Sequence, residues 1–374
     1  MSPRRGAPPR NARSRADALP RVAVVGLGIG RSHVVGLLQP PALAEVCALC
    51  DHNRSRLRRV GEEFGVAARY ADFEEMLEKE EPDAVVVATP NDLHAPVAVA
   101  ALEAGAHVLC EKPLAHRLDA AREIAEAARK RRRFVMLDLS FRFTGGARTA
   151  KRFLESGRCG DLYHSSTYWA RTRGIPTWAQ WFFTAARSGG GPVIDLGVHR
   201  IDLALWFLGE PAVERVAAFT HGRLGRRLVG AKYDVEEFGG GILRCAGGAS
   251  VVFETSWAEN SGRREVMLTR TLGVRGGAVH RNLDHTYEFV AELYEDRRGE
   301  LVEVDAKRFV LPALVPAREF VRGMLGGVPA QAGLPDVATG VALSEILAAI
   351  YLSAREGREV ALAEVRAGGA RRPG

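Results

Sequence analysis

Two different patterns of apolar positions divide the chain near residue 142. Up to that point, short runs rich in β-branched residues alternate with segments whose apolar residues recur at helical spacing. The runs are VAVV, EVCAL, a short piece near Tyr70, AVVVA, HVLC and FVMLDL. Near-continuous apolar strands that alternate with helices predict a parallel sheet covered on both faces. We therefore expect residues 21–142 to form one doubly wound α/β domain.

The second half of the chain follows a different pattern. One long apolar segment, GPVIDLGVHRIDLALWFLG, has helical spacing, and shorter apolar runs come after it. These runs are VERVAAF, GGILRC, ASVVFETSW, REVMLTR, TYEFVAEL and LVEVDAKRF. Consecutive strands with few helices between them predict a large, mostly antiparallel sheet, so residues 143–374 are expected to form an α+β domain. The final helical stretch, VATGVALSEILAAIYLSAREG, is compatible with packing on either domain.

The composition fits a chain that folds into two globular domains. Its 374 residues are 47% hydrophobic and 26% charged, which is enough to bury a core in each domain. We find no apolar run near the roughly 20 uncharged residues that a membrane-spanning helix needs. The N-terminal residues also lack the apolar core of a secretion signal. The expectation is a soluble, cytoplasmic protein with no membrane partner.

The N-terminal segment MSPRRGAPPRNARSRADALP carries much of the formal net charge of +7, because it holds five arginines and one aspartate. Some basic tails bind nucleic acid, but no aromatic or groove-reading motif accompanies this one. We expect residues 1–20 to be a disordered basic leader, and we expect no nucleic-acid partner.

The five cysteines form an odd and scattered set, which predicts reduced thiols rather than a disulfide framework. Cys47 and Cys50 make a CxxC pair, but the pair lies inside a predicted strand. Residues three apart on a strand point to opposite faces, so the two thiols are not expected to share a metal. No metal site is predicted.

A glycine-rich turn, VVGLGIGRSH, joins the first predicted strand to the first predicted helix. Gly26 and Gly28 fit the GxGxxG spacing, whereas the third glycine is Gly30 and Arg31 occupies the expected position. Gly26 would allow the sharp turn, and Gly28 would let the backbone approach a pyrophosphate. The free amides at the start of the helix would attract that anion. The segment therefore predicts a dinucleotide cradle in a Rossmann domain.

An acidic residue follows the second predicted strand. Asp51 lies 21 residues after Gly30, at the position where a carboxylate accepts hydrogen bonds from a ribose diol. Such a carboxylate repels a 2′-phosphate, so NAD is expected rather than NADP. Arg54 and Arg56 lie close by and oppose that preference. For His33, in the same turn, packing beneath the loop is expected rather than chemistry.

Polar side chains follow two further strands of the predicted parallel sheet. Thr89, Asn91 and His94 come after one strand, and Glu111 and Lys112 come after the next. Ligands of open parallel sheets bind beyond these strand ends, so we expect the five residues near a nicotinamide ribose. The sequence does not decide whether the peptide bond between Lys112 and the following proline is cis or trans.

The long apolar helix carries two polar residues on one face. Asp195 and His199 are four residues apart, and Asp202 lies about one turn further on. A carboxylate and an imidazole at this spacing can together hold a hydroxyl group and take its proton. The alternative is an aspartate that caps the helix and a histidine that packs in the core. Because the residues around the pair are apolar, we expect the two polar side chains to face a polar site.

Four motifs in series, GLGIGRSH, ATPNDLH, AGAHVLCEKPLA and SGGGPVIDLGVHRIDLALWFLG, resemble the glucose-fructose oxidoreductase and inositol dehydrogenase family, called Gfo/Idh/MocA. The resemblance covers residues 21–360. It implies a Rossmann domain followed by a domain whose open sheet covers the active site. It also implies that this sheet builds contacts in a homo-oligomer, a dimer or a tetramer.

The resemblance also assigns roles to individual residues. The catalytic group falls on Lys112, Asp195 and His199. A departure is visible after Arg142, where many relatives have a proline and this chain has Gly145 and Gly146. The implied cofactor-binding residues are Gly26, Gly28, Ile29, Gly30, Asp51, Thr89, Asn91, His94, Glu111, Lys112 and Arg142. The implied substrate-binding residues are Lys112, Tyr168, Arg171, Trp181, Asp195 and His199.

The predicted activity is that of an NAD-dependent oxidoreductase. It would oxidise a secondary alcohol, or reduce the matching ketone, of a sugar, aminosugar or cyclitol, in aminoglycoside or other secondary metabolism. His199 would remove the hydroxyl proton and Lys112 would donate to the substrate oxygen. One alternative is a non-catalytic dinucleotide or sugar sensor with the same fold, and another is an enzyme that oxidises and re-reduces one substrate with a retained cofactor.

Overall fold

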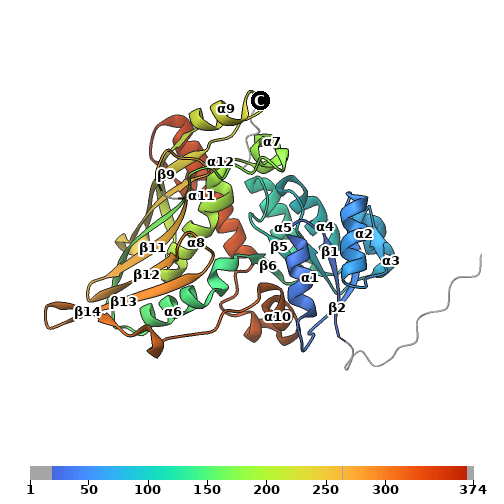
Figure 1. Cartoon of the computed structure of the whole chain (residues 1–374), viewed down its shortest axis with the longest axis horizontal. Helices are drawn as coiled ribbons and strands as arrows, with labels where there is room; N and C mark the ends of the chain where they lie inside the picture. The colour runs from blue at the N-terminus through green and yellow to red at the C-terminus, as the bar shows by residue number, and fades with distance from the viewer. Residues whose placement is uncertain (1–18, 263, 369–374) are drawn as a thin grey trace, which may run out of the picture.

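The computed structural model describes residues 19–262 and 264–368, and Figure 1 shows them as two domains side by side. The domain that holds the N-terminal strand has a small sheet flanked by helices, and the other domain has a larger sheet. Both expected sheets are present, which confirms the predicted fold class. Of the predicted basic leader, all but Leu19 and Pro20 lies outside the described residues.

The first sheet is the parallel sheet that the apolar runs predict. Its six strands have the order β3-β2-β1-β4-β5-β6, and each neighbouring pair runs parallel. The winding direction reverses between β1 and β4, where ligands bind beyond the carboxyl ends of the strands. The strands are β1 (Arg21–Val25), β2 (Glu45–Cys50), β3 (Arg69–Tyr70), β4 (Ala84–Val87), β5 (His107–Glu111) and β6 (Val135–Asp138).

Helices cover both faces of this sheet, which explains its continuous apolar strands. In β4, Ala84 and Val86 enter one buried cluster, whereas Val85 and Val87 enter another on the opposite face. The helical segments of this part of the chain are α1 (Gly30–Leu38), α2 (Arg54–Glu63), α3 (Phe73–Glu80), η1 (Asn91–Leu93), α4 (His94–Glu103), α5 (Leu118–Arg131), η2 (Ser140–Phe143) and α6 (Gly145–Leu154).

The second sheet has nine strands in the order β14-β13-β12-β11-β7-β10-β9-β8-β15. All neighbouring pairs run antiparallel except β7 with β10. The strands are β7 (Leu162–Arg171), β8 (Val213–His221), β9 (Phe238–Cys245), β10 (Ser250–Ser256), β11 (Glu265–Gly273), β12 (Gly276–Asn282), β13 (Phe289–Arg297), β14 (Glu300–Val304) and β15 (Val360–Ala361).

The apolar pattern does not predict the central strand β7. Its buried face carries Ser165 and Thr167 where an apolar residue is expected. Their hydroxyl groups lie 3.0 Å and 2.8 Å from those of Thr271 and Thr269 on β11. Hydroxyl pairs across neighbouring strands therefore replace apolar contacts in this part of the core.

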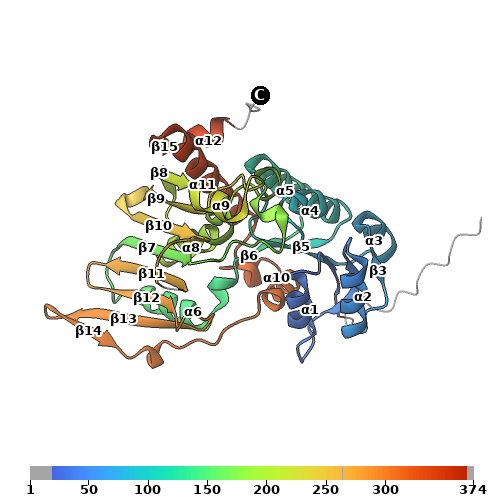
Figure 2. The same cartoon turned by 45° about the horizontal axis from the view of Figure 1, so that its top comes forward.

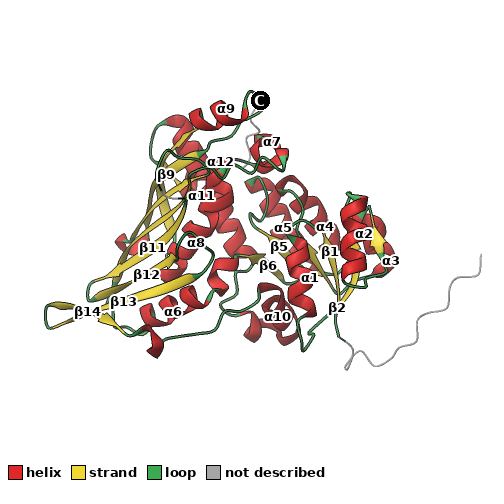
Figure 3. Cartoon of the chain, in the orientation of Figure 1, coloured by secondary structure: helices red, strands yellow, loops and turns green. Residues whose placement is uncertain are grey.

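The long predicted helix lies against the face of the large sheet that is turned toward the first domain (Figure 2). It begins with a π-helical turn, η4 (Val193–Gly197), and continues as α8 (Val198–Phe207). Figure 3 shows α6 and α8 on the same side of the sheet. The remaining helical segments before residue 310 are η3 (Gln180–Phe183), α7 (Ala185–Ser188), α9 (Arg223–Val229), η5 (Ala246–Gly248) and η6 (Ala306–Arg308).

The C-terminal helices return to the first domain. Helix α10 (Pro316–Gln331) packs beside α1, where Phe320 stacks on Phe134 with ring centroids 5.9 Å apart. Helix α11 (Val337–Glu356) contacts both α5 of the first domain and β8 of the second. The final helical stretch thus packs on both domains at once, and α12 (Leu362–Gly368) ends the described chain.

Helix α11 corrects one expectation about long apolar segments. With 20 residues, it is long and apolar enough to cross a membrane by length and composition alone. Half of its most apolar window is buried inside the protein, as in the core helix of a soluble protein. The prediction that no segment reaches this length was wrong, because a helix packed between two domains is apolar on several faces.

The described cysteines are free and buried, as predicted. Burial raises the pKa of the Cys47 thiol to about 11 and that of Cys50 to about 12. Since the thiolate is the reactive form, both side chains are inert core residues.

Candidate active site

Lys112 and Asp195 meet where the two domains face each other. Lys112 directly follows β5, and its peptide bond to Pro113 is cis. Asp195 lies in the π-helical turn before α8. The Lys112 Nζ atom donates to Asp195 Oδ1 at 2.6 Å and to the Asp195 carbonyl oxygen at 3.0 Å. An ammonium group at the edge of the first domain is thus held by the helix of the second.

The Asp195 carboxylate is fixed from two sides. Its second oxygen accepts a hydrogen bond of 2.9 Å from the indole nitrogen of Trp257. Burial alone would raise the pKa of Asp195, but the charges of Lys112 and Arg171 and these hydrogen bonds hold the pKa below its ordinary value. Asp195 is therefore ionised at neutral pH, with its charge directed at Lys112.

His199 lies one helical turn beyond Asp195 and is only 6% exposed. Its ring packs against Phe141 and Trp169, with centroids 4.9 Å and 6.0 Å away. Burial and the positive charges of Lys112 and Arg200 hold the pKa of His199 well below its usual value. The Nδ1 atom is buried and has no partner among the described residues, whereas Nε2 is not buried in this way. The site thus contains a neutral imidazole that can accept a proton.

The start of the helix that carries His199 is held by Glu236. This carboxylate accepts the Gly191 amide at 2.9 Å and the Val193 amide at 3.1 Å, and the Tyr351 hydroxyl donates to it at 2.9 Å. A Cβ atom on Gly191 would lie 2.0 Å from the Glu236 carbonyl oxygen, so this position requires glycine. Glu236 thus caps the helix, which rules out the alternative that Asp195 has this role.

The glycine-rich loop fits a bound phosphate group. Gly26 has a φ angle of +87°, and a Cβ atom there would lie 2.3 Å from the Ala88 carbonyl oxygen. At Gly28 the nearest atom is 3.9 Å away, so the backbone is open to close approach. Ile29, at the start of α1, is 57% exposed and makes no side-chain cap, so its side chain does not compete with an anion for the first amides of the helix.

Asp51 already accepts three hydrogen bonds inside the protein. The donors are the Leu27 amide at 2.8 Å, the Asn53 amide at 2.8 Å and the Arg56 guanidinium at 3.2 Å. A carboxylate offers about four acceptor positions, which leaves room for one ribose hydroxyl. Arg56 places a positive charge beside the same carboxylate. The NAD preference therefore depends on the balance of these two side chains.

The polar residues that follow β4 mainly shape the loops around Lys112. The two ring nitrogens of His94 lie 2.7 Å from the Pro113 carbonyl oxygen and 2.9 Å from that of Thr89. The Asn91 amide donates to the Ser188 carbonyl at 2.8 Å and so links the two domains. The Thr89 hydroxyl is buried and has no partner among the described residues, which leaves it free to bind a ligand.

Glu111 belongs to a buried cluster that the sequence analysis missed. Glu111 and Asp138 end the neighbouring strands β5 and β6 in register. The Nε2 atom of His33 lies 2.9 Å from Glu111 and 3.5 Å from Asp138. Burial and the Glu111 charge raise the pKa of Asp138 to about 7, while both carboxylates raise the pKa of His33 against the effect of burial. The sequence feature that could have predicted this cluster is the aspartate at the end of the sixth apolar run.

The structure does not bring Arg142 to the cofactor loop. Its guanidinium forms a bidentate pair with Asp202, at 2.8 Å and 2.6 Å, and a further ion pair with Glu210 at 2.8 Å. It also lies over the Trp206 ring. Because its charge is compensated within the second domain, we leave Arg142 out of the proposed cofactor site.

Tyr168 is likewise not brought to the site. Neighbouring residues on β7 point to opposite faces, and Trp169 is the one that packs against His199. The Tyr168 hydroxyl instead donates to Glu259 at 3.0 Å. Trp169, one position further along, is therefore the residue that contacts His199, and the sequence analysis did not name it.

Arg171 and Trp181 contact side chains that adjoin His199 and Asp195. Arg171 donates to Glu265 at 2.7 Å and to the Tyr287 hydroxyl at 2.7 Å, and its guanidinium lies 5.2 Å from the Trp169 ring. Trp181 stacks on Phe182 with centroids 3.9 Å apart, and Phe182 packs against Trp257. Trp181 thus connects to Asp195 through two aromatic rings, whereas Arg171 belongs to the same face of β7 as Trp169.

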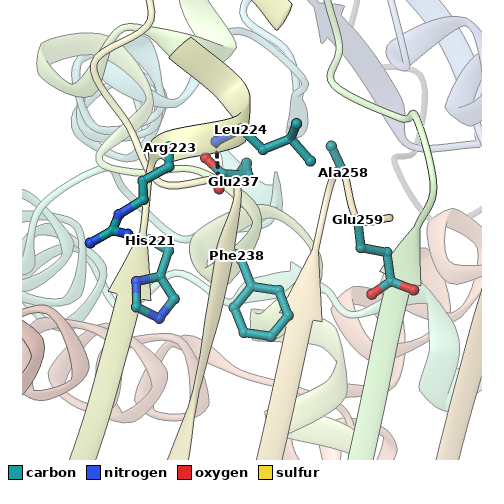
Figure 4. Close-up of a pocket in the computed structure, with 7 residues that line it drawn as sticks. All are labelled: His221, Arg223, Leu224, Glu237, Phe238, Ala258 and Glu259. Atoms are coloured by element: carbon teal, nitrogen blue, oxygen red, sulfur yellow. Dashed lines mark hydrogen bonds between the residues drawn. The ribbon is translucent and has the colours of Figure 1, made fainter. Parts of the chain in front are cut away.

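One surface hollow of about 370 Å³ lies apart from these residues (Figure 4). The Glu237 carboxylate within it already accepts the amides of Leu224 and Gly225, at 3.1 Å and 3.0 Å. We place no active site there, because the hollow contains none of the predicted site residues. It is lined by His221, Arg223, Leu224, Glu237, Phe238, Ala258 and Glu259.

Two family profiles match the chain in series. Residues 20–139 match the oxidoreductase family with an NAD-binding Rossmann fold. Residues 147–277 match the GFO/IDH/MocA C-terminal domain. The two matches cover the first sheet and most of the second, including the segment that holds Asp195 and His199.

Individual relatives match over nearly the whole chain. D-glucoside 3-dehydrogenase of Escherichia coli (strain K12) is 31% identical over 356 residues, which are 91% of this chain and 97% of that protein. The crystal structure of GenD2 from gentamicin A biosynthesis, in complex with NAD, has a TM-score of 0.76 and 28% identity, covering 95% of this chain and 99% of that one. Levoglucosan dehydrogenase with NADH shares the fold, with a TM-score of 0.78, 21% identity and coverage of 92% and 99%.

Proposed function

Because this chain belongs to the Gfo/Idh/MocA family of oxidoreductases, we propose that it is an NAD-dependent dehydrogenase of a sugar, aminosugar or cyclitol. The substrate would lose hydrogen from a secondary alcohol, or the matching ketone would be reduced. The observation that carries the proposal is the Lys112 ammonium held 2.6 Å from Asp195, with the buried neutral His199 one turn away.

In the oxidative direction, His199 accepts the proton of the substrate hydroxyl group through Nε2. Lys112 donates to the same oxygen and stabilises the negative charge that develops on it. Asp195 keeps Lys112 directed at that position, and Trp257 holds Asp195. Bound NAD supplies the acceptor for the hydride that leaves the substrate carbon. In the reductive direction the same proton returns from His199.

The proposed cofactor site combines the glycine-rich loop with the ends of β4 and β5. The open backbone at Gly28 and the free amides at the start of α1 would hold the pyrophosphate. Asp51 would accept one ribose hydroxyl, which supports NAD rather than NADP. The proposed residues are Gly26, Gly28, Ile29, Gly30, Asp51, Thr89, Asn91, His94, Glu111 and Lys112.

The proposed substrate class follows from the relatives and from the aromatic wall of the site. D-glucoside 3-dehydrogenase is named for a glucoside, and GenD2 belongs to gentamicin A biosynthesis. In this chain Trp169 and Trp181 offer faces for the C–H groups of a ring, while Arg171 offers a hydrogen-bond donor. The proposed substrate residues are Lys112, Trp169, Arg171, Trp181, Asp195 and His199.

We further propose that the protein is a cytoplasmic homo-oligomer, a dimer or a tetramer. Support comes from the face of the large sheet that points away from the helices, where Phe219 is 45% exposed and Val252 is 40% exposed. Light scattering after size-exclusion chromatography tests this proposal, because a monomer at all concentrations contradicts it.

A spectrophotometric assay tests the proposed activity. Purified protein is mixed with NAD and each member of a panel of glucosides, aminosugars and inositols, and NADH absorbance is recorded. At least one substrate should give turnover that His199→Asn lowers sharply, while NAD affinity changes little. Binding of NAD and a sugar without turnover would favour the sensor instead. A cofactor that copurifies and never exchanges would favour the enzyme that re-reduces its own product.

A further inference from the structure

The residue after the proposed base is an arginine that is buried without an acceptor. Arg200 is only 1% exposed. All three of its guanidinium nitrogens are buried and have no hydrogen-bond partner within residues 19–262 and 264–368. Arginine is charged at neutral pH, and buried charges are normally paired. Arg142 differs in this respect, because it is also buried, at 5% exposed, but has two ion pairs.

Aromatic rings surround the Arg200 charge and also hold His199. The guanidinium carbon lies 4.5 Å from the Phe141 centroid, 5.1 Å from that of Trp169 and 5.8 Å from that of Phe289. Phe141 and Trp169 are also the rings that pack against His199. Cation–π contacts compensate part of the lost hydration, but they do not neutralise the charge.

The other charges around His199 are largely compensated. The Lys112 ammonium is paired with Asp195 at 2.6 Å. On β11, the Glu265 carboxylate is already bonded to Trp169 and Arg171. On β12, His280 is buried, and burial holds its pKa well below the usual value, so it adds no charge. Tyr287 interacts with Arg171 and Glu265 and is neutral at pH 7. Within the described residues, Arg200 is thus the charge next to the imidazole that has no hydrogen-bonded partner, although Glu265 and Tyr287 attract it from a distance.

We propose that Arg200 is a positioning residue that keeps the His199 imidazole in its unprotonated, proton-accepting form. The inference rests on the proposed role of His199 as the base. A positive charge close by in a medium of low polarity disfavours a second positive charge on the ring. Burying the Arg200 charge then lowers the stability of the folded protein, and in return the charge keeps the base unprotonated.

The proposal predicts opposite effects on stability and on titration. Arg200→Met keeps the length of the side chain and removes the charge. The thermal midpoint Tm should stay the same or rise, because an apolar side chain suits the aromatic surroundings. The titration midpoint of His199 should rise by about one pH unit or more. Arg200→Lys should restore the low midpoint, and Arg200→Gln should reproduce the effect of Arg200→Met.

Nuclear magnetic resonance of labelled histidine in the full-length protein measures the His199 midpoint directly, with His199→Asn assigning the signal. Arg142→Met is the matched control, since it removes a buried but paired charge and should lower Tm. An unchanged His199 midpoint in both neutral variants overturns the proposal, as does a loss of stability equal to that of the control. This readout does not depend on turnover, so a fully active His199→Asn variant would refute the proposed base separately.

Discussion

Asp138 is the residue whose environment differs most from what its position in the sequence indicates. It ends a strand beside Glu111, and the two carboxylates share the His33 imidazole in a buried space. Burial and the neighbouring charge raise the pKa of Asp138 from 3.8 to about 7. Between these two values the folded protein binds a proton that the unfolded chain has released.

The free energy of unfolding should therefore fall as pH rises from about 4 to about 7, by the contribution of Asp138. The raised pKa of His33 acts in the same direction, because its stabilising effect is also lost at higher pH. Asp138→Asn should make Tm less dependent on pH in this range. The difference in Tm between about pH 4 and about pH 7 should change by roughly 2 °C or more. Thermal melts at several pH values measure this, and parallel curves for the two proteins would contradict it.

Asp51 and Arg56 should control cofactor choice in opposite directions. Asp51→Ala removes the acceptor for a ribose hydroxyl and the charge that repels a 2′-phosphate. The ratio of NADP to NAD dissociation constants should fall by about tenfold, the effect of about 1.4 kcal/mol. Arg56→Ala should raise the same ratio. Calorimetric titration with both cofactors measures these constants, and an unchanged ratio in both variants would show that other residues select the cofactor.

Residue-level predictions from the sequence succeed where a residue's role follows from its local backbone conformation. Gly26 is an example, because its positive φ angle follows from the turn itself. These predictions fail where a residue's role depends on which face of its strand or helix is turned toward the site. Tyr168 and Trp169 are adjacent and aromatic, and only the register of β7 determines that Trp169 reaches His199. Arg142 is similar, since its partner Asp202 lies on a helix 60 residues away.

At the scale of elements, the start of the helix that carries His199 depends on a distant part of the chain. The apolar spacing predicts the helix, but its π-helical first turn is held by Glu236 on a separate segment and by Tyr351 on α11. The longer strands of the first sheet were predictable, because burial on both faces leaves a continuous apolar signal, whereas the two-residue β3 is only half-buried. Strand β7 was not, because hydroxyl pairs occupy its buried face.

Gly191→Ala should disturb this helix start and, through it, Asp195. The new Cβ atom would lie 2.0 Å from the Glu236 carbonyl oxygen, so the turn has to shift. The turnover number should fall by about tenfold or more, while NAD affinity changes little. Gly262→Ala is the control, since a Cβ atom there meets nothing within 4 Å. Equal kinetics in the two variants would show that the turn does not position Asp195.

At the scale of the whole molecule, the proposed site takes residues from both domains. Lys112 comes from the first domain, while Asp195 and His199 come from the second. Helix α11 packs on both, and α10 returns to complete the core beside α1. The order of the motifs predicts two domains, but the return of the C-terminal helices depends on packing surfaces that exist only after both sheets form.

The turnover number of Lys112→Met tests the central claim most directly. The variant keeps the length of the side chain and removes the ammonium group that the account places at the reacting oxygen. With the best sugar or cyclitol substrate, its turnover number should be lower than that of the wild type by about 10²-fold or more, as for the loss of one oxyanion donor. The dissociation constant for NAD, measured on the same preparation, should change little. A variant that keeps near-normal turnover would contradict the assignment of Lys112 and Asp195 as the centre of the active site.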